Sequence, residues 1–258
     1  MILTQAPRLL SRLWHRRARG VWLVAALVVA GDLARAEIEA AYYDIPTQKY
    51  GHNVLPGGEY AALGFRLTGG REIGAGTLDT VYEDTAPRLV DLDGDGSNEV
   101  ITVVSYFDRG AALRIFDEVK SEDHPSGTTV AVVAETPPIG TRFRWLAVVG
   151  ATDLNADGVM EIAYVDRPHL AKTLRIWQYR DAQLTEVATL RNVTNHRIGE
   201  PDIAGGIRAC GQGPEMILAS ANWRELLAVT WDDAGFARRV LGTDTSRPAF
   251  ARAMSCND

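Results

Sequence analysis

Two stretches of nine residues decide the fold: residues 91–99, which read DLDGDGSNE, and residues 153–161, which read DLNADGVME. They share the pattern Asp-Leu-Asp/Asn-x-Asp-Gly-x-x-Glu. Each runs directly into a segment rich in β-branched and aromatic residues, VITVV at 100–104 and IAYV at 162–165, and such segments favour strands. A polar loop followed by a strand therefore occurs twice, which predicts a repeated β-unit.

Two fainter copies extend the repeat. Residues 54–65 read VLPGGEYAALGF and residues 207–220 read IRACGQGPEMILAS, and both keep a glutamate but lack the aspartates. The aligned glutamates of the four copies are spaced by 40, 62 and 54 residues: Glu59, Glu99, Glu161 and Glu215. A second short strand is expected in three copies, at 112–116, 173–177 and 227–231. No segment after residue 36 has the pattern of an amphipathic helix of normal length.

These units predict an all-β fold. A unit of about 50 residues with about four short strands matches one blade of a β-propeller. We therefore expect a small propeller of four or five blades, each of about four antiparallel strands. A single blade cannot bury both of its faces, so the blades must pack against one another. An open array is the competing arrangement, and closure into a ring is favoured because it removes two exposed ends.

The two acidic loops predict metal binding. Carboxylates at alternate positions of a tight loop can converge on one point, where their repulsion is relieved by a hard dication. Calcium suits such a site because it accepts about 6–8 oxygen ligands in flexible geometry. The expected ligands of the first site are Asp91, Asp93, Asp95, the Ser97 carbonyl and Glu99. Those of the second are Asp153, Asn155, Asp157, the Val159 carbonyl and Glu161. We expect about two calcium ions, with the first site tighter because it carries more charge.

The loops have two other interpretations, an EF-hand and an ordinary turn. An EF-hand needs a carboxylate at loop position 12 and a helix after it, whereas position 12 here is Thr102 or Tyr164 within an expected strand. The other interpretation is an ordinary solvated Asp-Gly turn between two strands. Two loops with the same spacing and the same following strand favour a metal site over a chance turn.

The loops and the strands after them resemble FG-GAP or VCBS repeats, the blade units of integrin-type β-propellers. The resemblance implies calcium in the two loops at the ligands named above, with Glu99 and Glu161 able either to bind the ion or to brace the loop. The chain departs from the family in lacking the Phe-Gly and Gly-Ala-Pro signature, and two of its four units lack the aspartates. It also resembles small exported repeat proteins of proteobacteria.

Residues 1–36 have the layout of a secretory signal peptide. Five arginines precede the apolar run 21–30, and Ala34 and Ala36 supply small residues before a cleavage site at Glu37. The alternative is a retained membrane anchor, for which ten apolar residues are short. We expect a periplasmic or secreted protein of residues 37–258 without stable membrane insertion. In an oxidising compartment Cys210 and Cys256 would form a disulfide; the alternative is two unpaired buried thiols.

The charge distribution excludes a general nucleic-acid binder. The whole chain carries a formal net charge of −6, but residues 37–258 hold 21 strong bases against 32 acids, a net charge of −11. A phosphate-backbone binder needs a basic face. An acidic body instead fits a protein that collects cations.

No recognisable catalytic set is present, so the sequence favours a non-enzymatic role. The histidines after residue 36 are His52, His124, His169 and His196, and no nucleophile elbow, His-Glu-x-x-His motif or phosphate loop accompanies them. The leading hypothesis is an exported propeller, stabilised by structural calcium, that binds a protein or a glycan. The alternative is a periplasmic hydrolase or lyase with calcium as Lewis acid, which needs His52, His196 and Arg144 to converge. A third hypothesis is a purely structural surface module.

Overall fold

The computed structural model describes residues 37–232 and 234–257, which belong to one compact unit. The predicted signal peptide, residues 1–36, lies outside the described residues. The all-β prediction is confirmed, because the strands of the described chain form three sheets in which every pairing is antiparallel. One short α-helix, α1 (Arg247–Met254), follows the last strand.

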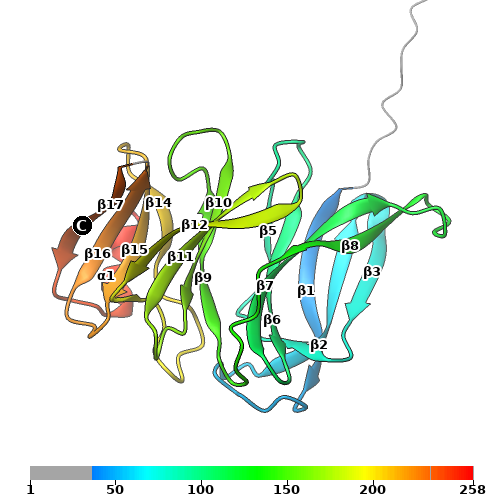
Figure 1. The fold of residues 1–258 in the computed structure, drawn as a ribbon, viewed down its shortest axis with the longest axis horizontal. Coiled ribbons are helices and arrows are strands. Elements are labelled where there is room, and N and C mark those ends of the chain that lie inside the picture. Colours follow the sequence, from blue (N-terminus) through cyan, green and yellow to red (C-terminus); the bar gives the residue numbers. More distant parts are fainter. Residues whose placement is uncertain (1–36, 233, 258) are drawn as a thin grey trace, which may run out of the picture. The chain divides into compact units, whose positions relative to one another are not determined.

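Figure 1 shows the three sheets in chain order. The first sheet holds β1 (Ile38–Thr47), β2 (Glu59–Leu67), β3 (Arg71–Gly76), β4 (Thr80–Tyr82), β5 (Arg88–Val90), β6 (Glu99–Tyr106), β7 (Gly110–Lys120) and β8 (Thr128–Glu135). The second sheet holds β9 (Leu146–Thr152), β10 (Met160–Asp166), β11 (Thr173–Arg180) and β12 (Gln183–Arg191). The third sheet holds β13 (Val193–Thr194), β14 (Gly206–Ala209), β15 (Pro214–Ser220), β16 (Leu226–Asp232) and β17 (Gly235–Gly242).

The sequence repeat corresponds to one antiparallel meander that occurs three times, as β6–β7–β8, β10–β11–β12 and β15–β16–β17. The repeated glutamate lies at the start of the first strand of each meander. In the second meander the strand before the glutamate is one continuous strand, β9. In the first meander the corresponding strand is split into β4 and β5, which both pair with β6, and in the third it is split into β13 and β14, which both pair with β15.

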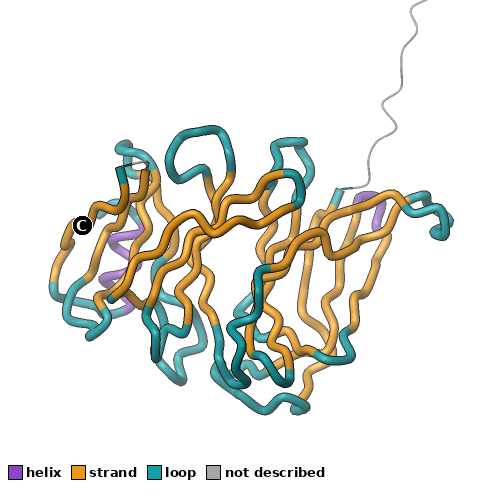
Figure 2. Tube along the Cα trace, viewed as in Figure 1, coloured by secondary structure: helices purple, strands orange, loops and turns teal. Residues whose placement is uncertain are grey.

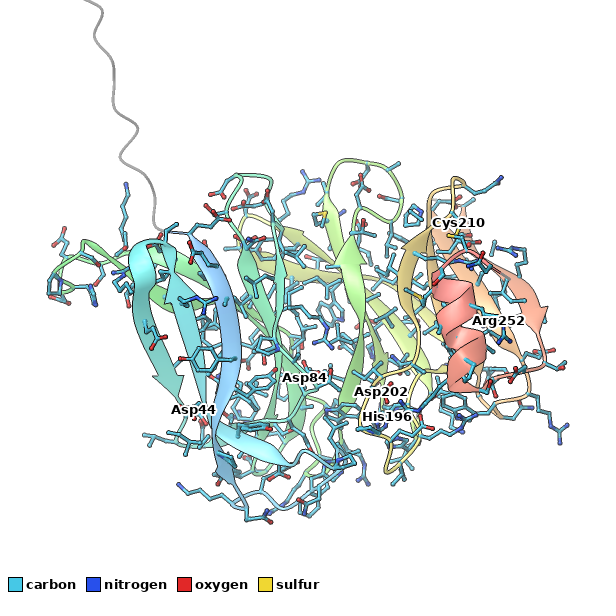
Figure 3. All side chains as sticks on the ribbon, turned by 180° about the vertical axis from the view of Figure 1, so that it is seen from behind. Asp44, Asp84, His196, Asp202, Cys210 and Arg252 are labelled. Atoms are coloured by element: carbon cyan, nitrogen blue, oxygen red, sulfur yellow. A yellow bond between two sulfur atoms is a disulfide. The ribbon has the colours of Figure 1, made fainter. Side chains whose placement is uncertain are left out.

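The expected ring of four or five separate blades is not formed by the described strands. Strand β4 pairs with both β2 and β6, which joins the first two units into one eight-stranded sheet. The first and third sheets lie at opposite ends of the row, with β9–β12 between them, in both Figure 1 and the reverse view of Figure 3. Three full meanders fall short of the typical minimum of about four blades that closes a propeller ring.

The middle strands are buried on both faces, and this explains their continuous apolar runs. In β10, Ile162 and Tyr164 pack in the core shared with the first sheet, whereas Ala163 and Val165 pack in the core shared with the third. Alternate residues of a strand point to opposite faces, so both sets must be apolar. Loops gather at the two ends of the strands (Figure 2), and these two edges carry the candidate sites.

Candidate functional site

The first acidic loop joins β5 to β6 and is held by its own aspartates. The Asp91 carboxylate accepts hydrogen bonds from the backbone N–H groups of Gly94 (2.7 Å) and Gly96 (3.1 Å). Both glycines have positive φ, which costs glycine little. The Asp93 and Asp95 side chains each accept a hydrogen bond from the N–H two residues later, at 3.1 and 2.8 Å. These bonds fix the backbone of the loop.

Glu99 closes the loop from the first position of β6, where it is fully buried. Its Oε2 accepts a hydrogen bond of 2.6 Å from the N–H of Leu92. Its Oε1 has no hydrogen-bond partner. Burial, together with the negative charges of Asp93, Asp117 and Asp91, raises the pKa of Glu99 to about 7. A buried carboxylate oxygen without a donor is costly unless something positive binds it.

Three acids of this loop meet. Asp91, Asp93 and Glu99 each offer a carboxylate oxygen within 4.8 Å of the others, and no other group of three acids, histidines or cysteines is so close in the described chain. Asp95, a predicted ligand, is outside this group, and its Oδ1 accepts the N–H of Ser97. The arrangement is suited to a cation with oxygen ligands.

Asp117 is a fourth acid at this site that the sequence pattern does not indicate. It lies on β7 beside Glu99, because β6 and β7 pair with Val100 opposite Phe116. Its charge is one of those that raise the pKa of Glu99. Only the register of two strands brings it to the loop, so no spacing within the nine-residue motif could have identified it.

The second loop, between β9 and β10, is closed by the same two kinds of side chain, an aspartate at its start and a glutamate at its end, but one of the two backbone N–H groups that bind the aspartate differs. The Asp153 carboxylate accepts the N–H groups of Asp157 (3.1 Å) and Gly158 (2.9 Å), and Glu161 Oε2 accepts the N–H of Leu154 (2.8 Å). The Val159 N–H donates to Asp157 Oδ1 at 2.8 Å. Burial raises the pKa of Glu161 as well. The brace between glutamate and loop is therefore common to both units.

Side-chain amides occupy this second loop. Asn155 Nδ2 donates to Asp157 Oδ2 at 3.1 Å, and Gln178 Nε2 approaches Glu161 Oε1 at 3.4 Å. Gln178 lies opposite Glu161 on β11, the position that Asp117 takes on β7. A cation in this loop would have to displace these N–H donors. The geometry thus favours the first loop over the second as a cation site.

The two units without aspartates keep the glutamate brace in altered form. Glu59 accepts hydrogen bonds from the N–H groups of three successive residues, 51–53, at 2.9, 2.7 and 3.1 Å. Glu215 instead binds Arg208 at 2.7 Å and Arg239 at 2.8 Å. Neither unit presents converging aspartates.

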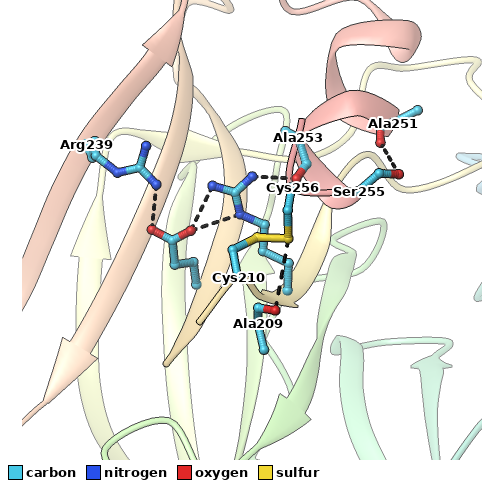
Figure 4. Close-up of a disulfide and its surroundings, with 9 residues drawn as sticks. Ala209, Cys210, Arg239, Ala251, Ala253, Ser255 and Cys256 are labelled. Atoms are coloured by element: carbon cyan, nitrogen blue, oxygen red, sulfur yellow. Dashed lines mark hydrogen bonds and ion pairs between the residues drawn. A yellow bond between two sulfur atoms is a disulfide. The ribbon is translucent and has the colours of Figure 1, made fainter. Parts of the chain in front are cut away.

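The predicted disulfide between Cys210 and Cys256 is present, with their Cα atoms 5.7 Å apart. It ties the loop between β14 and β15 to the residue that follows the C-terminal cap of α1 (Figure 4). Beside it, Arg208 bridges Glu215 to the carbonyl of Ala253 in the helix.

A pocket of about 260 Å³ lies at the other ends of the strands. Its walls come from the loop before β2, the segment before β9, the loop after β10 and the segment after β13. They are lined by His52, Phe143, Arg144, Trp145, Arg167, Pro168, His169, Leu170 and Ile198. His124 is elsewhere, in the turn between β7 and β8 with Ser126.

Two histidines at this pocket, His169 and His196, are hydrogen-bonded, and burial lowers the pKa of both. His169 Nε2 lies 2.9 Å from His196 Nδ1, and His196 Nε2 lies 2.9 Å from the carbonyl of Glu200. His52 Nδ1 lies 2.9 Å from Oε1 of Glu83, whose pKa is raised by burial. Burial, and then the neighbouring His196, lowers the pKa of His169 to about 4. The structure thus brings His52, His196 and Arg144 into one region. It adds Glu83 and His169, which no spacing indicated.

The acidic loops and the histidine pocket are separated by the length of a strand. Glu161 stands at one end of β10 and the pocket lies beyond Asp166 at its other end. The six residue steps from Glu161 to Arg167 in the pocket wall, at about 3.3 Å each, amount to roughly 20 Å. In Figure 3, His196 lies at the lower edge and Cys210 at the upper edge, where β15 begins. A metal bound by the aspartates is therefore remote from a ligand among the histidines.

No protein-family model and no curated protein matches the chain. The likeness to FG-GAP and VCBS repeats remains a prediction carried by the two loops. Within the residues that the structure describes, no helix has the length and apolar character needed to cross a membrane.

Proposed function

We propose that this chain is an exported, calcium-binding β-repeat module without enzymatic activity, in which calcium is structural and the folded body binds a protein or a glycan. The observation that carries the proposal is the buried Glu99, whose Oε1 has no hydrogen-bond partner while its carboxylate lies with those of Asp91 and Asp93. A cation there would offset both the burial of Glu99 and the mutual repulsion of the three acids.

Calcium is the ion that the donors favour. All three converging side chains are carboxylates, whose oxygens suit the irregular coordination that calcium accepts. Magnesium prefers a rigid octahedron with several waters. In the proposed site Asp91, Asp93 and Glu99 bind directly, the Ser97 carbonyl and water complete the shell, and Asp95 holds the turn or joins the shell after a small rotation.

Calorimetric titration of the purified, chelator-treated protein with calcium tests this proposal. We expect a tight saturable binding step, lost in Asp93→Ala and retained in Asp108→Ala, which removes an exposed charge in the turn between β6 and β7. Calcium at about 100 times its dissociation constant should stabilise the fold by about 2.7 kcal/mol, a rise in melting temperature of roughly 5–10 °C. The proposal fails if millimolar calcium gives no heat, or if Asp93→Ala binds as tightly as the parent.

The second calcium site is proposed as the weaker one. Its loop keeps Asp153, Asp157 and Glu161, but the amides of Asn155 and Gln178 already occupy two of the carboxylates. Asp157→Ala should therefore leave the tighter calorimetric step unchanged.

Export to the periplasm or the exterior is supported by the disulfide, since such bonds persist in oxidising compartments. N-terminal sequencing of the exported protein should begin at Glu37, and an intact Met1 would overturn this part. The exposed apolar rim of the histidine pocket, where Leu170 and Ile198 are 63% and 75% exposed, supports a partner-binding surface. The hydrolase or lyase alternative, with calcium as Lewis acid, is disfavoured because the acidic loops lie a strand length from the histidines.

A further inference from the structure

Two histidines beside the pocket at the far end of the strands are hydrogen-bonded to each other. His169 is in the loop between β10 and β11, and His196 follows β13. The two atoms that approach are His169 Nε2 and His196 Nδ1, 2.9 Å apart. His196 is fully buried, whereas His169 forms part of the wall of the open pocket.

The contacts of His196 fix its tautomer. Its Nε2 lies 2.9 Å from the backbone carbonyl of Glu200, which can only accept a hydrogen bond. The neutral ring therefore carries its proton on Nε2, and the lone pair of Nδ1 is directed at His169. Metal-binding histidines typically have this arrangement, in which the second ring nitrogen donates to a carbonyl or a carboxylate. Transfer of the His169 proton to its Nδ1 would place two lone pairs around one point.

The spacing of the two nitrogens fits two bonds to one metal ion. Bonds of about 2.0–2.1 Å at a right angle place their nitrogen atoms about 2.9 Å apart. The tetrahedral angle preferred by zinc would need a separation of about 3.3–3.4 Å. The observed 2.9 Å thus matches the nitrogen separation expected for the square or octahedral geometry of Cu²⁺ or Ni²⁺.

The surroundings leave room for further ligands and supply compensating charge. The pocket of about 260 Å³ admits water or a small anion. Glu200 and Asp202 lie close enough to His196 to act on it electrostatically. Across the pocket, His52 is oriented by Glu83 and leaves its Nε2 for a ligand held there. The Arg144 guanidinium, which donates to the Phe143 carbonyl, provides positive charge for an anion.

We propose that His169 and His196 bind a divalent transition-metal ion, Cu²⁺ or Ni²⁺ by their geometry, with open positions that face the pocket. This site is separate from the calcium loop and differs from it in chemistry, because imidazole nitrogen favours transition metals whereas carboxylate oxygen favours calcium. The molecule would then carry an oxygen site and a nitrogen site at opposite ends of the same strands.

Titration of the untagged, chelator-treated protein with Cu²⁺, in saturating calcium, tests the proposal. We expect one tight site whose electron paramagnetic resonance spectrum shows hyperfine coupling to two imidazole nitrogens. His169→Gln should weaken Cu²⁺ binding at least tenfold. The matched control, His124→Gln in the distant turn between β7 and β8, should bind as the parent does.

Two results would overturn the proposal: a spectrum without coupling to two imidazoles, or equal affinity in His169→Gln and the parent. The spectrum of the parent protein decides the matter even where a variant folds poorly. Asp93→Ala separates this site from the proposed calcium site, because it should keep the Cu²⁺ signal. Loss of calcium binding and loss of Cu²⁺ binding are therefore distinguishable failures.

Discussion

At the scale of single residues, the two carboxylate oxygens of Glu99 have different surroundings, which separates its observed role from its proposed one. In Glu99, Oε2 accepts the N–H of Leu92 and braces the loop, while Oε1 lacks a hydrogen-bond partner and is proposed to bind the ion. The family resemblance allowed either role. The structure shows the brace in both acidic loops, and the proposed ligand role adds to it.

The nine-residue motif predicted which loop side chains converge only in part. Asp91, Asp93 and Glu99 meet, because their alternate positions and the two glycines specify the turn. Asp117 and Gln178 could not be predicted from spacing. They approach the loops through pairing between strands, and strand register depends on contacts far apart in the chain.

Separate substitutions of the two cross-strand residues, Gln178 and Asp117, should shift calcium affinity in opposite directions. Gln178→Asp replaces an N–H donor beside Glu161 with a carboxylate, so the second loop should bind calcium more tightly. Asp117→Asn should weaken the first loop. One unit charge near a surface site contributes on the order of 1 kcal/mol, about fivefold in the dissociation constant. Calorimetry of each variant measures this change, and shifts in the same direction would refute the assignment.

At the scale of elements, α1 was missed by the sequence analysis because it is only eight residues long. Ser246 caps its start by accepting the N–H of Ala249, and Phe250 and Ala253 pack against the third sheet. The three buried residues of α1, Ala249, Phe250 and Ala253, are too few to give a recognisable helical pattern in the sequence. The disulfide beside it was predicted, since two cysteines in an exported chain have one possible pairing.

The disulfide should contribute substantially to the stability of this end of the molecule. It joins residues 46 apart, for which the chain-entropy relation gives about 4 kcal/mol. The double variant Cys210→Ser with Cys256→Ser should therefore have a clearly lower denaturation midpoint in urea. Reduction of the parent protein by dithiothreitol should lower it to the same value. An unchanged midpoint would mean that α1 is held by packing alone.

Glu215 makes the stability of the third sheet depend on pH. Burial alone would raise the pKa of Glu215, but hydrogen bonds from Arg239 and Arg208 outweigh burial and lower it. The folded state then binds fewer protons than the unfolded state near the ordinary glutamate pKa of about 4.3. The stabilisation is present above that pH and is lost as the pH falls through the lower, folded value.

Glu215→Gln reveals this dependence. Near neutral pH the variant should be less stable than the parent, because the buried Arg208 loses its charged partner. The difference should shrink as the pH falls below about 4. Urea midpoints of both proteins across the acid range measure it, and a difference that stays constant with pH would contradict the pKa assignment.

At the scale of the whole molecule, the sequence predicted the β-units but not how they join. The apolar runs of β6 and β10 indicated strands, and their burial on both faces confirms stacked sheets. No closed ring is detected among the described strands. The short strand β4 carries three buried residues without a distinctive pattern, yet its pairing with both β2 and β6 merges two units.

The charge of the whole molecule predicts two distinct responses to salts. Residues 37–258 carry a net charge of −11. The excess acidic groups repel one another in the folded state, and monovalent salt screens that repulsion. Raising sodium chloride from about 0.05 to about 0.5 M should raise the melting temperature of the calcium-free protein by a few degrees. Calcium should add a further increment at high salt in the parent and a smaller one in Asp93→Ala, which keeps only the weaker second site. An increment that disappears at high salt would indicate general screening instead of a bound ion.

The glutamate brace also bears on how such repeats diverge after duplication. The units at Glu59 and Glu215 lack the aspartates, yet each glutamate still ties its strand to neighbouring groups. The tie made by the glutamate therefore does not depend on aspartates in the same copy. Under the proposed calcium function, loss of the ion in one copy would therefore leave the glutamate of that copy in its structural role.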